Sequence, residues 1–118
     1  KMLEFQRNGF LIVIITNQSG IARGFISEKQ YAEVNTRMLE LLEKEGVEIS
    51  DVFMCPSHPD ENDPRRKPNP GMILEAAQKF DVGLSESVLA GDSGSDLEAG
   101  KRAGVLSLTV SELLTFSF

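Results

Sequence analysis

Three short segments of the sequence carry side chains able to bind or transfer a phosphoryl group. The first is TNQSGIARG, residues 16–24, in which hydroxyls and amides follow an apolar run and accompany two glycines. Consecutive backbone N–H groups and short hydroxyls can surround a phosphate, and glycines allow the backbone to approach it closely. An ordinary polar turn is the alternative, but nine such residues after a strand favour a phosphate-binding loop. Its candidate ligand-binding residues are Thr16, Asn17, Gln18 and Ser19.

The second segment, RRKPNPGM at residues 65–72, places three cations in a proline-flanked loop before an expected helix. A helix N-terminus favours anions. Arginine can grip phosphate oxygens with two hydrogen bonds, and lysine can act as a point charge on a transferring phosphoryl group. Arg65 is interpreted as solvated surface charge. Lys67, held between Arg66 and Pro68, is the stronger candidate.

The third segment, GDSGSD at residues 91–96, contains two carboxylates four residues apart, Asp92 and Asp96. Carboxylate oxygens with open water positions suit Mg²⁺, which commonly binds one or two carboxylates together with a substrate phosphate. Capping of the following helix by Ser95 or Asp96 is the alternative. Asp92 is not needed as a cap, so it is the better candidate for a metal ligand.

Cys55 and His58 form one further pair of metal-binding side chains. A structural zinc site needs four ligands, and the chain contains no other cysteine or histidine. The sequence therefore disfavours zinc.

The elements that must position these segments alternate between apolar strands and amphipathic helices, a pattern typical of a parallel sheet covered by helices. All three segments follow, or lie close behind, the carboxyl ends of expected strands, where open parallel sheets bind ligands. The tail from Ser111 is ambiguous. The predicted strands are Phe10–Thr16, Val52–Cys55, Ser87–Ala90 and Val105–Val110, and the predicted helices are Lys1–Asn8, Ser27–Glu45, Gly71–Phe80 and Asp96–Ala103. Ser27 is the expected N-cap of the second helix and Asn69 that of the third.

Bulk properties limit the possible functions. The 118 residues, 41% of them hydrophobic, are enough for a single domain. The longest apolar run, Phe10 to Ile15, is far shorter than the roughly 20 residues of a membrane helix. A net charge of −6 disfavours nucleic acid as a partner. The single cysteine is compatible with a reducing compartment, and we expect a cytoplasmic protein.

Together, the three segments resemble the haloacid dehalogenase (HAD) superfamily, and within it the branch of heptose-bisphosphate and histidinol-phosphate phosphatases. TNQSGIARG, RKPNPGM and GDSGSD are similar to the second, third and fourth motifs of that family. The resemblance runs from about Lys1 to Val105. It implies a three-layer α/β/α Rossmann-like core with a parallel sheet, and Mg²⁺ as cofactor. It also implies attack by an aspartate carboxylate on phosphorus, followed by hydrolysis of the aspartyl-phosphate.

The resemblance gives each candidate residue a role. Thr16 would bind the transferring phosphoryl group, and the three residues after it would line the substrate site. Lys67 would neutralise charge between nucleophile and phosphate, while Arg66 would hold the substrate. Asp92 would ligate Mg²⁺, with Asp96 supporting it from the next turn.

Three features depart from the family pattern. The Asp-x-Asp motif that supplies the nucleophile on the first strand does not occur in the sequence, so we expect a longer natural protein and a core lacking its central strand. The zinc loop of the family begins with Cys-x-His. Here Ser57 stands at the position of that histidine, and His58 follows one residue later. Ser93 occupies a position where the heptose enzymes usually have lysine.

Loss of the central strand would leave apolar edges without a partner on the strands at Phe10–Thr16 and Ser87–Ala90. Buried backbone groups must be paired. The two strands could pair directly, or another chain could fill the gap, so self-association through these edges is one expectation.

The function predicted from the sequence is Mg²⁺-dependent hydrolysis of a phosphomonoester, with a small sugar phosphate or related metabolite as substrate. The 118 residues alone should be inactive because they lack the nucleophile. A polynucleotide 3′-phosphatase is one alternative, since such enzymes have a similar TNQ loop and KP-x-x-G-M pattern, but the acidity and the absence of tryptophan disfavour it. A non-catalytic phosphate-binding module is the other.

Overall fold

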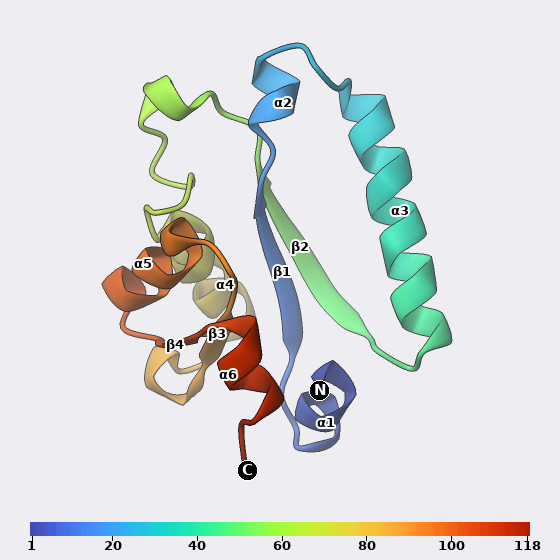
Figure 1. Ribbon diagram of the computed structural model, residues 1–118, viewed down its shortest axis with the longest axis vertical. Coiled ribbons are helices and arrows are strands. Elements are labelled where there is room, and N and C mark those ends of the chain that lie inside the picture. Colours follow the sequence, from blue (N-terminus) through green and yellow to red (C-terminus); the bar gives the residue numbers. More distant parts are fainter. The chain divides into compact units, whose positions relative to one another are not determined.

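The computed structural model describes all residues from Lys1 to Phe118, which form two compact units. Unit 1 is Lys1–Glu61 and unit 2 is Asn62–Phe118. Each unit contains a two-stranded parallel sheet with helices of its own (Figure 1). The predicted α/β class with parallel strands is therefore confirmed, and the arrangement of the whole chain as a single domain stays a prediction.

Unit 1 is built on β1 (Ile12–Asn17) and β2 (Ile49–Cys55), which pair in parallel. β1 is the β-branched run expected of a strand, because such side chains pack well on a pleated surface. β2 begins three residues earlier than predicted, since Ile49 pairs with Ile12 at the start of β1. The remaining elements of unit 1 are α1 (Met2–Arg7), α2 (Ser19–Ala22), α3 (Glu28–Lys44) and the 3₁₀ helix η1 (Pro59–Glu61).

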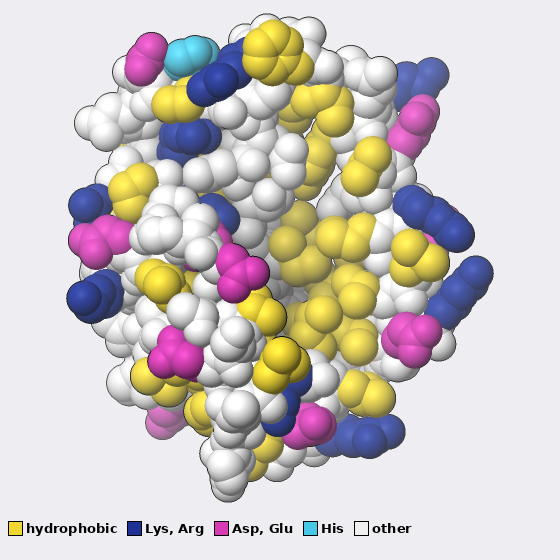
Figure 2. All heavy atoms as spheres, in the orientation of Figure 1, with side chains coloured by type: hydrophobic (Ala, Val, Ile, Leu, Met, Phe, Trp, Pro, Cys, Tyr) yellow, Lys and Arg dark blue, Asp and Glu magenta, His cyan; other side chains and the backbone are white.

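The long helix α3 begins at its predicted cap. The Ser27 hydroxyl accepts a hydrogen bond from the Gln30 amide at 3.0 Å, and the Gln30 side chain accepts one from the Ser27 amide at 2.8 Å. This capping box satisfies two backbone donors that the helix cannot. No α3 residue is buried, and Val34 is 65% exposed. Figure 2 shows hydrophobic side chains gathered over this part of unit 1, so its apolar face is incompletely covered.

Unit 2 is built on β3 (Val88–Ala90) and β4 (Leu106–Leu108), again in parallel. α5 (Gly94–Ala103) packs against both strands and buries Ala99, Gly100 and Ala103. A Cβ atom on Gly100 would lie 3.1 Å from Ser107 Cβ and 3.4 Å from Leu89 Cβ, so a larger residue would push the helix away. The other helices are α4 (Gly71–Phe80), η2 (Leu84–Glu86) and α6 (Val110–Leu114).

Two helix starts differ from the sequence prediction. α4 has Pro70 at its N-cap position and no side-chain cap, so the predicted Asn69 cap is wrong. The Asn69 amide donates instead to the Asp63 carbonyl at 2.9 Å. α5 starts two residues before the predicted Asp96, because Ser93 is the cap and Asp96 completes a capping box from the third helical position.

Each sheet contains two strands only: β1 pairs with β2, and β3 with β4. Direct pairing of the strands at Phe10–Thr16 and Ser87–Ala90 stays a prediction, because the two strands belong to different units. The second edge of β1 and of β3 thus carries no strand. No helix here has the length and hydropathy of a membrane-spanning segment.

Ser27→Ala should lower the free energy of unfolding by about 1 kcal/mol, because the first turn of α3 loses its side-chain acceptor. Ser111→Ala is the matched control, since Ser111 lies in α6 but is not its cap. Urea unfolding of the natural full-length protein measures both. Equal effects of the two substitutions would contradict the assignment of the cap.

Candidate functional site

The first predicted segment begins inside β1 rather than in a loop. Thr16 and Asn17 are the last two residues of the strand. The Gln18 amide then donates to the Cys55 carbonyl at 2.7 Å, which continues the pairing with β2. The chain next forms α2 at Ser19, so residues 19–22 are helical where a loop was predicted, and phosphate binding by this segment stays a prediction. The apolar run ending at Thr16 predicted the end of the strand, but no pattern in the following residues predicted the short helix α2.

Within this segment, the Thr16 hydroxyl accepts a hydrogen bond from Gln18 Nε2 at 3.0 Å. Its contact as donor to the Asn17 carbonyl is 3.5 Å long, which is beyond the usual range for O–H···O bonds. A hydroxyl that accepts one bond can still donate another. Thr16 therefore retains the donor that binding of a phosphate oxygen requires, and Gln18 orients it.

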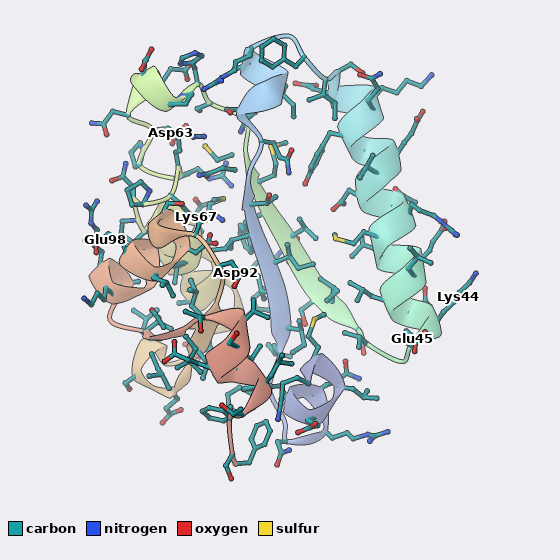
Figure 3. The ribbon with its side chains drawn as sticks, in the orientation of Figure 1. Lys44, Glu45, Asp63, Lys67, Asp92 and Glu98 are labelled. Carbon is teal, nitrogen blue, oxygen red and sulfur yellow. The ribbon has the colours of Figure 1, made fainter.

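In unit 2, the second and third predicted segments are joined by an ion pair. Lys67 Nζ donates to Asp96 Oδ1, and the two side chains are only 12% and 19% exposed. Asp96 Oδ2 accepts a hydrogen bond from the Ser93 amide at 3.3 Å. Figure 3 shows Lys67 near the start of α5, with Glu98 on the outer side of that helix. The sequence identified both residues but not their pairing, because they are 29 positions apart.

The ion pair fixes the charge of Asp96. Burial alone would raise the pKa of the Asp96 carboxyl, but the hydrogen bonds from Lys67 and Ser93 and the Lys67 charge together lower it below its usual value. Asp96 is therefore ionised at neutral pH and provides a fixed counter-charge for the Lys67 ammonium.

Asp92 follows the end of β3 after Gly91, as predicted, and its side chain is exposed. Its Oδ1 accepts a hydrogen bond of 3.4 Å from the Val110 amide at the start of α6. Beside it, Gly91 leaves room for Asp96, since a Cβ atom there would lie 2.6 Å from Asp96 Cβ. The turn after β3, which carries Asp92 (Figure 3), thus lies against Asp96 at Gly91.

The carboxylates differ in their suitability for Mg²⁺. Both Asp96 oxygens already accept hydrogen bonds, whereas Asp92 has only the long one from Val110. No group of three or more His, Cys, Asp or Glu side chains is arranged to hold a metal ion. Mg²⁺ can bind one protein carboxylate together with water and substrate phosphate, so Asp92 fits as a ligand. The supporting role of Asp96 stays a prediction.

Several contacts fix the shape of the loop that carries Lys67. Arg65 Nε donates to Glu75 Oε2 on α4 at 2.6 Å, so Arg65 is a partly exposed surface charge with a fixed partner. The Arg66 amide donates to the Asp63 carbonyl at 2.9 Å. The Gly71 amide donates to the Pro64 carbonyl at 2.9 Å, and a Cβ atom on Gly71 would stand 2.9 Å from Arg65 Cα. A glycine is therefore required where this loop closes.

The Cys55 and His58 pair shows no arrangement for zinc. Cys55 is fully buried at the end of β2. His58 Nδ1 accepts a hydrogen bond from the Asp60 amide at 3.1 Å and lies 3.5 Å from Asp60 Oδ2. These contacts stabilise the turn at η1.

The structure thus groups the candidate residues in two sets. Thr16, Asn17, Gln18 and Ser19 follow or end β1 in unit 1, and Arg66, Lys67, Asp92 and Asp96 belong to unit 2. The Lys67–Asp96 pair joins the second and third segments. The prediction that both sets face one phosphate stays a prediction.

Asp96→Asn should lower the free energy of unfolding at pH 7 in the presence of EDTA, and this difference from the wild type should become smaller as the pH falls. A carboxyl whose folded pKa is lowered contributes stability above its unfolded pKa of about 4, and that contribution disappears as the pH falls through the folded value. Chemical unfolding of both forms between pH 7 and pH 3 measures the difference.

The matched comparison is the same substitution in a Lys67→Met background, where the attractive partner is absent and the loss at pH 7 should be smaller. A difference that stays constant across this pH range would contradict the ion pair.

Comparison with known proteins gives a consistent set of relatives. The chain is 46% identical over 104 residues to the D-glycero-alpha-D-manno-heptose-1,7-bisphosphate 7-phosphatase of Photorhabdus laumondii, covering 82% of this chain and 57% of that protein. It is 45% identical over 108 residues to the D-glycero-beta-D-manno-heptose-1,7-bisphosphate 7-phosphatase of Mesorhizobium japonicum, covering 84% of this chain and 49% of that protein. The chain therefore spans about half the length of the relatives it matches.

Among solved structures, the chain is similar to the D,D-heptose 1,7-bisphosphate phosphatase of B. bronchiseptica, whose crystal contains magnesium and phosphate. The TM-score is 0.84 at 34% identity, and the match covers 90% of this chain and 59% of the other. The family model described as polynucleotide kinase 3 phosphatase matches residues 1–106. On this evidence the chain belongs to the polynucleotide kinase 3 phosphatase family, within the HAD superfamily of phosphatases.

Proposed function

We propose that this protein is a Mg²⁺-dependent phosphomonoester hydrolase that acts on a small sugar phosphate. The observation that carries the proposal is the Lys67–Asp96 ion pair, set beside the exposed Asp92 at the carboxyl end of β3. It combines a fixed cation for a phosphoryl oxygen with a carboxylate available for a metal. The heptose-bisphosphatase relatives support this assignment.

Several residues are proposed to neutralise the negative charge of the phosphoryl group. In unit 2, the Lys67 ammonium would lie against a phosphoryl oxygen as negative charge develops there. In unit 1, the Thr16 hydroxyl is proposed, from the family resemblance alone, to donate to a phosphoryl oxygen. Asp96 holds the Lys67 ammonium in place through the ion pair. Asp92 would hold the Mg²⁺ ion, which would supply Lewis-acid polarisation of the phosphoryl group.

The nucleophile is an aspartate carboxylate that attacks phosphorus while the bond to the sugar oxygen breaks, and water then hydrolyses the acyl phosphate. None of the 118 residues forms an Asp-x-Asp pair. The proposal therefore includes a nucleophile from a strand-forming segment outside this sequence. Such a strand has two available positions, the unpaired edges of β1 and β3. The same edges would allow self-association of the isolated 118 residues.

For the substrate, Arg66 and residues 17–19 are proposed to contact the sugar phosphate. A heptose 1,7-bisphosphate is favoured by the relatives, which would place the enzyme in carbohydrate metabolism. Histidinol phosphate is kept as an alternative because Ser93 replaces a lysine usual in the heptose enzymes. In this chain, Ser93 caps α5 and so has a structural role instead. The free, buried Cys55 favours a reducing compartment such as the cytoplasm.

A polynucleotide 3′-phosphatase is the second candidate, and the matching family model favours it. The net charge of −6 opposes it, because binding to a phosphate backbone draws on lysine and arginine.

Release of inorganic phosphate by the full-length protein with Mg²⁺ distinguishes these substrates. We expect turnover of heptose 1,7-bisphosphate to exceed that of a 3′-phosphorylated oligonucleotide by about 100-fold in kcat/KM, since binding of a nucleic-acid backbone relies on lysine and arginine and this sequence has a net charge of −6. The reverse preference would establish the second candidate. No turnover of any phosphomonoester would rule out both.

Asp92→Asn should reduce phosphate release by about 100-fold or more, because the ligand for Mg²⁺ loses its charge while the shape is retained. Asp81→Asn is the matched control: Asp81 is exposed at the end of α4 with φ 51°, a backbone conformation that asparagine adopts readily. Activity of Asp92→Asn close to that of the control would remove Asp92 from the site.

A further inference from the structure

The loop that carries Lys67 is connected to α5 at a second point. Arg102 Nη1 donates to Asn69 Oδ1 at 3.2 Å, and Asn69 Nδ2 donates to the Asp63 carbonyl at 2.9 Å. Asp63 and Asn69 are the two ends of the segment that contains Lys67. The Asn69 side chain thus joins the two ends of this segment. Arg102 in turn holds the Asn69 side chain.

Arg102 determines which way the Asn69 amide faces. A primary amide has an oxygen that accepts and a nitrogen that donates, and rotation by half a turn exchanges them. A guanidinium only donates, so it selects the orientation with Oδ1 toward Arg102. In that orientation Nδ2 faces the Asp63 carbonyl, where a donor is needed. The opposite orientation would place two acceptors against each other.

Arg102 is itself held by a neighbour on α5. Its Nε donates to Glu98 Oε1 at 3.1 Å, one helical turn earlier. Figure 3 shows Glu98 on the outer side of α5. The contacts therefore run in one series from Glu98 through Arg102 and Asn69 to Asp63.

We infer that Arg102 is a positioning residue for Lys67, acting through the orientation of the Asn69 amide. α5 then fixes the loop at two places: Asp96 in its first turn holds the Lys67 ammonium, and Arg102 in its last turn holds the closing side chain. The inference extends the proposed function, since its effect on catalysis depends on the role proposed for Lys67.

Direct binding of substrate by Arg102 is the competing explanation. Arg102 is 46% exposed, and its recorded hydrogen bonds go to Glu98 and Asn69. A guanidinium engaged on two sides fits a positioning role better than a role as phosphate ligand. The two explanations differ in their effect on KM.

The test uses the natural full-length protein and the variants Arg102→Met, Arg102→Lys and Lys101→Met. Lys101 is the matched control, because it is an exposed cation on the same helix with no side-chain contact to the loop. Two quantities are measured: hydrogen exchange of the Arg66, Asn69 and Gly71 amides, which close the loop, and kcat and KM for phosphate release.

Arg102→Met should speed exchange of these loop amides about three- to tenfold, as expected for loss of one hydrogen bond. It should lower kcat by a similar factor while KM changes less than about twofold, because an interaction made in the transition state is weakened. Arg102→Lys should recover part of both effects, since lysine retains a donor. Lys101→Met should leave both unchanged.

Unchanged exchange in Arg102→Met would overturn the inference, whatever the activity. A raised KM with kcat unchanged would also overturn it and indicate contact with substrate. If Arg102→Met speeds exchange of the loop amides but the wild-type protein hydrolyses no phosphomonoester, the role of Arg102 in holding the loop is retained and the proposed function fails. If Arg102→Met does not fold, Glu98→Gln tests the same series, and it should change loop exchange in the same direction by a smaller factor.

Discussion

The ion pair between Lys67 and Asp96 is the contact on which the arrangement of unit 2 depends. Both side chains are largely withdrawn from water, and a charge in that position is costly without a partner. Asp96 is also placed in the first turn of α5, where the helix dipole stabilises a negative charge. One carboxylate therefore completes the capping box of α5 and holds the loop through the Lys67 ammonium.

Close packing around α5 makes this geometry possible. Gly100 allows the helix to lie directly against β3 and β4, and Gly91 leaves space for the Asp96 carboxylate across the turn. The strand end that presents Asp92 and the helix that presents Asp96 are thereby brought to one place. The loop that carries Lys67 is closed by the hydrogen bond from the Gly71 amide to the Pro64 carbonyl, and Lys67 contacts Asp96 on the same helix.

Unit 1 presents a different physical situation. The β1 run is apolar on both faces, as in parallel sheets that are covered on both sides, yet every residue of the strand is only half-buried. One edge of β1 carries no strand, and α3 leaves apolar side chains exposed. Thr16 nevertheless keeps a defined orientation, because its contacts come from its own strand end and from Gln18.

The sequence alone determined what neighbouring residues encode. The alternation of strands and helices, the Ser27 cap and the place of Asp92 after a strand followed from periodicity and local hydrogen bonding. The motif residues were also identifiable because their types and spacing are chemically unusual.

Only the tertiary structure decided the contacts between distant residues. The pairs Lys67–Asp96, Arg65–Glu75 and Arg102–Asn69 depend on how α4, α5 and their loop pack, and no local pattern records them. Asn69 illustrates the reason. Its sequence position favoured a helix cap, but a carbonyl and a guanidinium brought close by folding offered its amide better partners.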